Sequence, residues 1–274
     1  ISIHEEDWYA ERDIDLELNT VVTEVDTDAK EVHTYDGETY EYDKLLVATG
    51  GTPTQLPVDN SDAEGIHHFW TFQDARAIRE SADEADTGIV VGAGLLGIDL
   101  AAICGAQDVE ANYLMRGNCW WRYALTEDGA EIIHEALEEN GVTPVFDSGV
   151  DHFTTDDDGQ VTGAVDPNGE EFDGEFVGVA IGLNFNTEFL EGSGLELDDG
   201  IVTDEYMQTN VEDVYAAGDI TRYYDTILGE QAQNGAWGSA KEQGAVAGKN
   251  MVADDEAEEF RWVSSYSITH FDFP

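Results

Sequence analysis

The sequence predicts an α/β fold, in which parallel strands alternate with crossover helices. A β-branched run at 89–91 is typical of a buried strand, and it continues through a glycine-rich turn into an apolar helix over 98–103. A second strand at 110–115 and a helix at 128–140 repeat this alternation. Two further apolar strands, at 44–47 and 214–217, each end in a glycine-containing turn.

The turn after the strand at 89–91 has the pattern G-x-G-x-x-G, formed by Gly92, Gly94 and Gly97. In a dinucleotide site the first glycine permits the tight turn, the second lets the backbone approach a pyrophosphate, and the third lets the helix pack closely on the strand. The helix N-terminus then presents free N–H groups and a positive dipole end to the phosphates. The strand–turn–helix context favours nucleotide binding over a glycine-rich turn that binds nothing.

The composition is strongly acidic. The 274 residues include 61 acidic and 11 basic side chains, for a formal net charge of −50. Nucleic acid and an anionic membrane surface are excluded as partners, because both would be repelled. The apolar fraction of 41% argues against disorder. Because concentrated salt screens self-repulsion, we predict a halophilic source.

Cysteine and histidine usage indicates a reducing compartment and no metal site. Cys104 and Cys119 form no C-x-x-C pair, which suits the cytoplasm. We find no signal peptide and no apolar run of membrane length. Cys104 is expected to be a packed core thiol, whereas Cys119 is expected to be more exposed. The seven histidines show no metal-ligand spacing, so we predict no metal.

The first 71 residues predict a small antiparallel meander that leads into a buried strand. A short helix at 6–13 precedes a half-buried strand at 14–18. The turn at Asp36-Gly37 joins two runs as a hairpin. The ranges with strand character are 20–25, 31–35, 39–42 and 44–47.

The remaining elements follow the α/β pattern. A helix at 72–82 begins near Asp74, whose charge suits the helix dipole. Turns at 156–159 and 167–170 indicate hairpins before a strand that ends at 177–181. A helix at 236–251 follows the last strand. The acidic run 254–259 indicates a linker, after which a further domain could begin.

Three motifs in this order resemble the FAD/NAD(P)-dependent pyridine nucleotide-disulfide oxidoreductase superfamily. They are DKLLVATGGTP at 43–53, IVVGAGLLGIDLAA at 89–102 and VYAAGDI at 214–220. The resemblance implies two Rossmann-like, three-layer dinucleotide-binding domains, with the NAD(P) domain inserted in the FAD domain. We expect 1–71 and 189–255 to form the FAD domain, 72–188 the NAD(P) domain, and 256–274 a linker and the start of a C-terminal domain.

The resemblance also implies roles for individual residues. Thr49 and Gly50 would lie at the crossover beside FAD, and Asp219 would hydrogen-bond the ribityl chain, with Gly218 allowing the close approach. The helix at 236–251, near Gln243, would aim its N-terminus at the flavin. The further cofactor-binding candidates are Leu95 and Leu96 on the glycine turn, Asp99 near the nicotinamide, and Gly182.

The chain departs from the family pattern in two places. No G-x-G-x-x-G precedes the ATG motif to hold the FAD adenosine, and the chain opens with Ile1, so we expect it to be truncated at both ends. The C-x-x-C or C-x(4)-C pair of disulfide-reducing relatives is also absent.

The implied function is a flavoprotein reductase that passes hydride from NAD(P)H to FAD and electrons onward to a small molecule or a redox protein. The alternative is a nicotinamide-nucleotide-binding module without flavin or turnover. A second copy of the chain, forming a homodimer, is a further candidate partner.

The strand at 110–115 bears on the choice between NADP and NAD. An NAD site usually carries Asp or Glu about 20 residues past the glycines, and here Met115 takes that position. Arg116 follows at once, and Arg122 lies six residues later. Their spacing resembles the 2′-phosphate clamp of NADPH-dependent relatives, for which arginine supplies planar, bidentate donors. The alternative is that both arginines pair with surface carboxylates.

Four other side chains are expected to have structural rather than functional roles. Trp120, Trp121 and Trp237 are expected to pack at a domain boundary, because tryptophan buries a large area. His134 is expected to be a surface or boundary residue.

Overall fold

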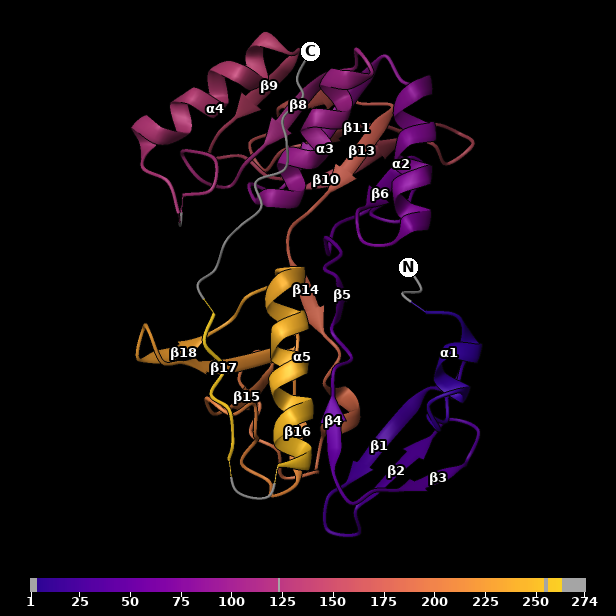
Figure 1. The fold of residues 1–274 in the computed structure, drawn as a ribbon. Helices are drawn as coiled ribbons and strands as arrows, with labels where there is room; N and C mark the ends of the chain where they lie inside the picture. Colours follow the sequence, from indigo (N-terminus) through magenta and orange to yellow (C-terminus); the bar gives the residue numbers. More distant parts are fainter. Residues whose placement is uncertain (1–3, 123, 254–255, 263–274) are drawn as a thin grey trace. The chain divides into compact units, whose positions relative to one another are not determined.

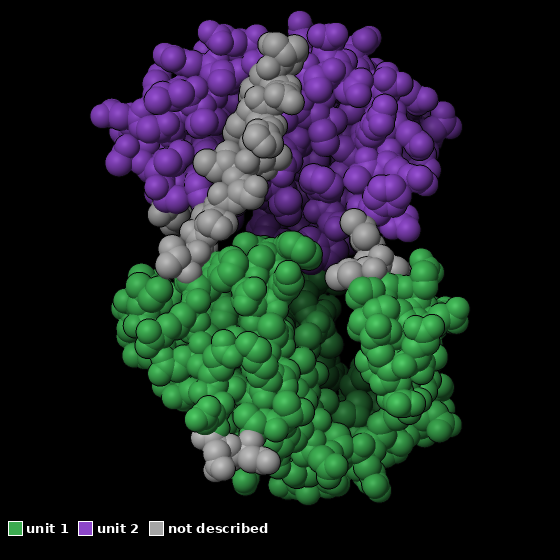
Figure 2. All heavy atoms as spheres, viewed as in Figure 1, with its two compact units in different colours: residues 1–52, 185–267 green, residues 53–184, 268–274 purple. Residues whose placement is uncertain are grey.

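A computed structural model describes residues 4–122, 124–253 and 256–262. The chain forms two compact units (Figure 2). Of the described residues, unit 1 contains those up to Thr52 and those between Phe185 and Trp262, and unit 2 contains those between Pro53 and Asn184. The sequence placed the first boundary at 71/72. Residues 53–71 lie in unit 2 because the strand Ile66–His68 pairs with its sheet.

Unit 2 is built on a parallel sheet of five strands (Figure 1). In spatial order they are β6 (Ile66–His68), β13 (Phe176–Val179), β7 (Thr87–Val91), β8 (Glu110–Leu114) and β9 (Val142–Val145). Because the strands run in the same direction, their carboxyl ends meet at one edge. In sheets of this kind, ligands bind outside that edge.

The two faces of this sheet pack against different layers. Helices α2 (Phe72–Glu84), α3 (Leu95–Ala106) and α4 (Glu127–Glu139) cover one face and share a core that contains Val90. The antiparallel strands β10 (His152–Thr155), β11 (Val161–Val165) and β12 (Glu171–Asp173) cover the other face, with Ile89 and Val91 in that core. Alternate residues of β7 therefore serve alternate cores, as the pleat requires. The predicted three-layer α/β architecture of this region is confirmed.

The helix starts in unit 2 follow from local sequence. Thr71 caps α2 by accepting a hydrogen bond from the Asp74 backbone N–H at 3.1 Å, and the Asp74 carboxylate accepts from the Thr71 backbone in return. This capping box satisfies two backbone donors that the helix geometry leaves unpaired. Thr126 caps α4 through its side chain alone, which accepts the Gly129 N–H at 3.2 Å.

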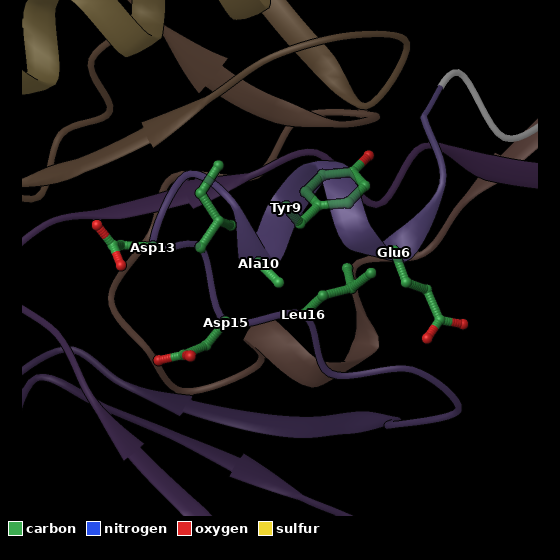
Figure 3. Close-up of a pocket in the computed structure, with 7 residues that line it drawn as sticks. Glu6, Tyr9, Ala10, Asp13, Asp15 and Leu16 are labelled. Atoms are coloured by element: carbon green, nitrogen blue, oxygen red, sulfur yellow. The ribbon is translucent and has the colours of Figure 1, made fainter.

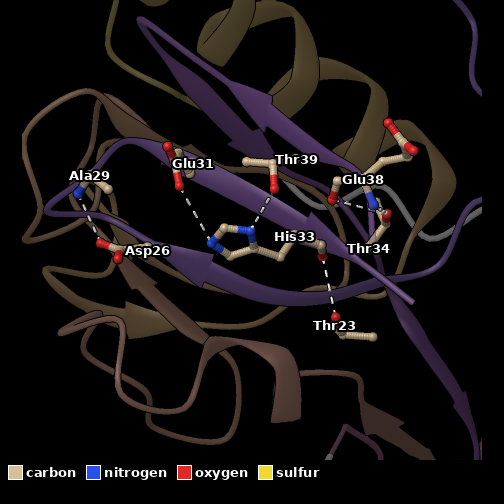
Figure 4. Close-up of polar contacts among 8 residues, drawn as sticks. All are labelled: Thr23, Asp26, Ala29, Glu31, His33, Thr34, Glu38 and Thr39. Atoms are coloured by element: carbon tan, nitrogen blue, oxygen red, sulfur yellow. Dashed lines mark hydrogen bonds and ion pairs between the residues drawn. The ribbon is translucent and has the colours of Figure 1, made fainter. Parts of the chain in front are cut away.

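Unit 1 begins with a short helix, α1 (Glu6–Ala10), and an antiparallel meander. The meander consists of β1 (Val22–Asp26), β2 (Glu31–Thr34) and β3 (Thr39–Glu41), and Figure 4 shows its polar contacts. The Asp26 carboxylate accepts the Ala29 N–H at 2.8 Å and closes the first turn. The strand predicted at 14–18 is wrong: these residues are exposed and pair with no strand in the described chain.

The rest of unit 1 has two further groups of strands. β4 (Leu45–Val47) pairs in parallel with β16 (Val214–Ala216). β15 (Ile201–Thr203), β17 (Thr221–Asp225) and β18 (Glu230–Ala232) form a second sheet, and helix α5 (Trp237–Val252) contacts β16. Phe260 packs in the same core as Tyr223, so 256–262 belong to unit 1. The predicted C-terminal domain otherwise falls on 263–274, outside the described residues.

The chain passes between the units at two places, near β5 (Gly51–Pro53) and β14 (Leu183–Phe185), and these strands pair with each other. A single-turn helix, Glu188–Leu190, follows β14. Within the described ranges, none of the helices combines the length and hydrophobicity needed to cross a bilayer.

Candidate functional site

The glycine turn of unit 2 lies at the carboxyl edge of the parallel sheet. Gly92 follows β7 with φ +114°, a conformation that other residues rarely adopt. A Cβ built on Gly92 would also collide with the Ala180 carbonyl, because Ala180 donates to Val91 at 2.8 Å and lies against the turn. Gly182, a predicted site residue, follows β13 at the same edge, with open space where its side chain would lie.

Gly97 lets α3 approach the strand, as predicted. A Cβ at this position would collide with the Gly92 carbonyl and the Tyr113 hydroxyl. Tyr113 is fully buried on β8, and its hydroxyl donates to the Gly92 carbonyl at 2.7 Å. Burial strongly raises the Tyr113 pKa, which keeps the hydroxyl a neutral donor. The sequence did not predict this role of Tyr113. The feature that could have indicated it is a polar hydroxyl in the middle of a buried strand.

Gly94 is the N-cap of α3 and has an ordinary extended backbone, without a side-chain cap. No atom lies within 4 Å of a Cβ built on it, so the space beyond the turn is open. The first N–H groups of a helix have no intrahelical acceptor, so they are available to a ligand. Leu95 is half-buried against the core and Leu96 is exposed, whereas Asp99 lies one turn along α3, half-buried.

The residues after β8 differ in their availability to a ligand. Met115 is fully buried in the helix-side core, and its N–H and carbonyl pair with Val145 and Ser148 at 2.9 and 3.0 Å. The structure therefore places Met115 in the core. Arg116 is the first exposed side chain after the strand, and among the described residues no carboxylate lies within ion-pair distance of its guanidinium.

Arg122 folds back over the start of the same loop. A Cβ built on Gly117 would lie 2.9 Å from Arg122 Cδ and 3.3 Å from its Nη1. The Arg122 guanidinium therefore lies against the residue next to Arg116. The structure brings the two predicted arginines together in one loop at the carboxyl end of β8.

The candidate site of unit 1 is built on two paired strands. β4 and β16 are parallel, with Val47 opposite Ala216, so the ATG and GD turns emerge at the same edge. Thr49 is exposed, and Gly50 has φ +59° with open space beside it. The structure thus brings Thr49 and Gly50 to the same edge as Gly218 and Asp219.

Asp219 is half-buried, and burial raises the pKa of its carboxyl group. Among the described residues, no hydrogen bond to this carboxylate is found, and its Oδ2 faces Gly235, 3.9 Å from a Cβ built there. A carboxylate that is partly withdrawn from water normally accepts hydrogen bonds from nearby donors. This carboxylate is therefore suited to accept a hydrogen bond from a hydroxyl of a bound molecule.

Gln243 holds the GD turn in place from α5. Its fully buried Oε1 accepts the Gly218 N–H at 2.7 Å and the Thr221 hydroxyl at 2.8 Å, and its Nε2 donates to Ser239 Oγ at 3.2 Å. Gly218 has φ +88°, which favours glycine. The resemblance placed Gln243 near the flavin, and its observed contacts are with the protein.

The burial of the two cysteines and of Trp237 can be compared with the prediction. Cys104 is fully buried as predicted, and burial raises the pKa of its thiol to about 12. Cys119, expected to be more exposed than Cys104, is buried as well, at 4% exposure against 0%. Trp237 is 75% exposed rather than packed at a boundary. Among the described residues, no cluster of His, Cys, Asp or Glu side chains could hold a metal ion.

A shallow pocket lies beside α1 and the extended residues that follow it (Figure 3). Carboxylates of Glu6, Asp13 and Asp15 line it together with Tyr9 and Leu16. Acidic side chains repel phosphates, so this pocket is not a dinucleotide site.

Comparisons with known proteins agree with this arrangement. A family model described as pyridine nucleotide-disulphide oxidoreductase matches residues 5–244. An assimilatory nitrate reductase electron transfer subunit of Bacillus subtilis is 27% identical and matches 84% of this chain and 29% of its own length. An NADH oxidase of Methanocaldococcus jannaschii is 30% identical and matches 90% of this chain and 56% of its own length.

A solved structure shares the fold. The putidaredoxin reductase–putidaredoxin complex matches 91% of this chain and 61% of that chain, with a TM-score of 0.86 and 27% identity. This likeness confirms the predicted fold class. The chain spans less than two thirds of each of these three proteins.

Proposed function

Because this chain belongs to the pyridine nucleotide-disulphide oxidoreductase family, we propose that the whole protein is a flavoprotein that takes hydride from NAD(P)H and passes electrons through FAD to a further acceptor. Unit 2 binds the nicotinamide nucleotide in this proposal, and unit 1 binds FAD. The observation that carries the proposal is the glycine turn of unit 2, where a helix N-terminus faces open space beyond Gly94.

The residues of unit 2 fit a dinucleotide. A pyrophosphate beyond Gly94 would accept hydrogen bonds from the N–H groups at the start of α3 and would lie at the positive end of its dipole. The Tyr113 hydroxyl holds the turn in place by donating to the Gly92 carbonyl. Leu96 and Gly182 border the same edge of the sheet.

The residues of unit 1 fit the sugar-like chain of a flavin. The Asp219 carboxylate lacks a protein donor among the described residues and lies beside an open glycine-rich turn. Gln243 holds the Gly218 N–H, so the turn keeps one geometry before any ligand arrives. Thr49 and Gly50 lie at the same strand edge and complete the candidate contacts.

When bound, the two cofactors supply the redox chemistry: the nicotinamide donates hydride and the flavin accepts it and releases electrons. The chain binds and orients the two groups. Neither cysteine takes part in this proposal, because both are buried and the Cys104 thiol stays protonated at neutral pH.

The acceptor follows from the chemistry of the relatives. Their names include reductases for nitrite and for small redox proteins as well as an NADH oxidase. We propose a small molecule or a redox protein as the acceptor, a cytoplasmic location, and neither nucleic acid nor membrane as a partner. The proposal also includes a second copy of the chain as a partner, in a homodimer.

NADPH is the preferred nucleotide in this proposal. Arg116 is exposed at the carboxyl end of β8, where the adenosine ribose lies in sheets of this kind, and lacks a carboxylate partner among the described residues. In a chain with 61 acidic residues, an arginine without such a partner is suited to an external phosphate. Arg122 lies against Gly117 in the same loop and would form the second half of the clamp.

The test is the FAD content of the full-length protein purified in molar KCl. We expect stoichiometric FAD in the wild type and at least about tenfold weaker FAD binding in Asp219→Asn, which cannot offer a charged acceptor. Asp28→Asn, at an exposed position in the same unit, is the matched control and should keep its flavin. A wild-type protein without flavin would reject the proposed function.

A further inference from the structure

The residues between β8 and α4 include a tightly held segment, 116–122, which we call the arginine loop. The Gly117 carbonyl accepts the Asp147 N–H at 3.1 Å. The Asn118 side chain donates to the Glu127 carboxylate. The Trp121 N–H donates to the Ala93 carbonyl at 3.2 Å, so the arginine loop is tied directly to the glycine turn.

A further tether comes from a histidine. His134 on α4 is only 7% exposed, which differs from the surface or boundary position expected from the sequence. Its Nε2 accepts the Trp120 backbone N–H at 3.1 Å. Because Nε2 is an acceptor, the ring proton lies on Nδ1, facing the Glu131 carboxylate at 3.8 Å, a distance too long for a hydrogen bond. The ring packs on Phe146, with centroids 4.7 Å apart.

The Trp120 N–H depends on this acceptor. The Trp120 side chain is 3% exposed and belongs to the helix-side core, so the backbone here cannot turn toward water without removing the indole from the core. An N–H left without an acceptor in such a place loses its hydrogen bonds to water and gains none in return. Loss of the His134 acceptor would therefore shift the backbone at Trp120 rather than leave it in place.

Such a shift would reach the arginines. Trp121, the next residue, has φ +48°, an uncommon conformation that its hydrogen bond to Ala93 holds in place. Arg122 comes directly after it, and Arg116 begins the same loop. The spacing between the arginines and the glycine turn is thus set by the tethers at Trp120 and Trp121.

We infer that His134 is a positioning residue for nucleotide choice: its Nε2, by accepting the Trp120 N–H, holds the arginine loop where Arg116 and Arg122 meet the 2′-phosphate of a bound NADPH. The inference rests on the proposed function. His134 itself does not touch the nucleotide. Through the arginine loop it acts on the end of the ligand that carries the 2′-phosphate.

The test compares two adenosine ligands in the full-length holoprotein at one fixed salt concentration. Adenosine 2′,5′-bisphosphate carries the 2′-phosphate, and 5′-AMP lacks it, so the ratio of their Kd values isolates the arginine loop. We expect His134→Leu to reduce the preference for the bisphosphate about three- to tenfold, with 5′-AMP affinity within about twofold of wild type. His134→Gln, whose amide oxygen can accept the Trp120 N–H, should restore most of the preference.

Controls separate this role from general destabilisation. Glu131→Gln alters the neighbour at 3.8 Å and keeps the Trp120 hydrogen bond, so it should leave the Kd ratio unchanged. Amide hydrogen exchange at Trp120 should accelerate in His134→Leu and return toward wild type in His134→Gln.

An unchanged Kd ratio in His134→Leu would overturn the inference, whether both ligands bind as in the wild type or both weaken equally. That result together with a strong effect of Arg116→Ala would reject the role of His134 and leave the NADPH proposal intact. A wild type that shows no preference for the bisphosphate would reject the NADPH proposal itself, and the inference with it.

Discussion

The hydroxyl of Tyr113 links β8 to the glycine turn through a side chain, beside the backbone hydrogen bond from the Gly92 N–H to the Leu114 carbonyl. It donates to the Gly92 carbonyl from a fully buried position. Tyr113→Phe removes the donor and leaves the carbonyl without this partner, so we expect the free energy of unfolding to fall by about 1–2 kcal/mol. The measurement is chemical denaturation in molar KCl. The control is Tyr35→Phe, because Tyr35 is 86% exposed and should give no change.

The same variant should also weaken nucleotide binding, since the Gly92 carbonyl is part of the turn that positions α3. An equal, small effect of Tyr113→Phe and Tyr35→Phe on unfolding would show that the hydroxyl does not brace the turn.

In the proposed NADPH site, Arg116 is the residue that acts most directly on the choice of nucleotide. We expect Arg116→Ala to lower kcat/KM for NADPH about ten- to a hundredfold and to change the value for NADH little. The reason is that only NADPH carries a 2′-phosphate for the guanidinium to bind. Steady-state kinetics with both nucleotides at equal ionic strength make the comparison. Arg79→Ala, at an exposed position on α2, is the control. A wild type that prefers NADH, with a preference that Arg116→Ala does not alter, contradicts the clamp.

At the scale of the element, two glycines of one turn have opposite tolerance for a methyl group. Gly94 has an ordinary extended backbone and open space, so Gly94→Ala should fold with an unchanged Tm. Its methyl group would point into the space that a pyrophosphate needs, so nucleotide Kd should rise at least about tenfold.

Gly97→Ala is the opposite case. Its Cβ meets the Gly92 carbonyl and the Tyr113 hydroxyl, so we expect a loss of stability of about 1–3 kcal/mol. Thermal unfolding and nucleotide titration of the two variants check both expectations. Equal thermal stability of the two variants would mean that close packing of α3 on the strand is not the role of Gly97.

The elements of unit 2 were predictable because each has a strong local pattern. Strand β7 has a β-branched run, the turn after it has three spaced glycines, and α3 has apolar residues at helical spacing. The strand expected at 14–18 has the right alternation but lacks a partner strand in the described chain. Alternation indicates which side chains could share a face, whereas pairing is a property of the tertiary structure.

The candidate site was predictable only where it follows strand ends. Gly92, Gly218 and Arg116 lie within two residues of a strand end, so the topology fixes their edge. Tyr113, Gln243 and His134 act through hydrogen bonds to backbone groups distant in sequence, and a single polar residue in an apolar element does not indicate its partner. Met115 also follows a strand end and was expected to bind the cofactor, but its side chain lies in the core. Position after a strand therefore does not by itself identify a binding residue.

The charge of the whole chain predicts a dependence on salt. Eleven basic side chains cannot pair with 61 acidic ones, so most carboxylates repel one another in dilute buffer. We expect Tm to fall by more than about 5 °C between molar and low KCl, because the screening length increases as ionic strength falls. Comparing potassium chloride with sulfate at equal ionic strength separates screening from anion-specific exclusion. An unchanged Tm at low salt contradicts this account.

The proposed transfer of hydride, from a nucleotide on unit 2 to FAD on unit 1, would require both candidate sites at once. The direct measurement is an anaerobic titration of the flavin-loaded, full-length protein with NADPH in molar KCl, followed by the visible absorbance of the flavin. We predict complete loss of that absorbance at one NADPH per FAD, with a rate at limiting NADPH at least about tenfold lower in Gly94→Ala, because the methyl group obstructs the pyrophosphate. A flavin that neither NADPH nor NADH reduces, or one reduced at the same rate in Gly94→Ala, would contradict the account.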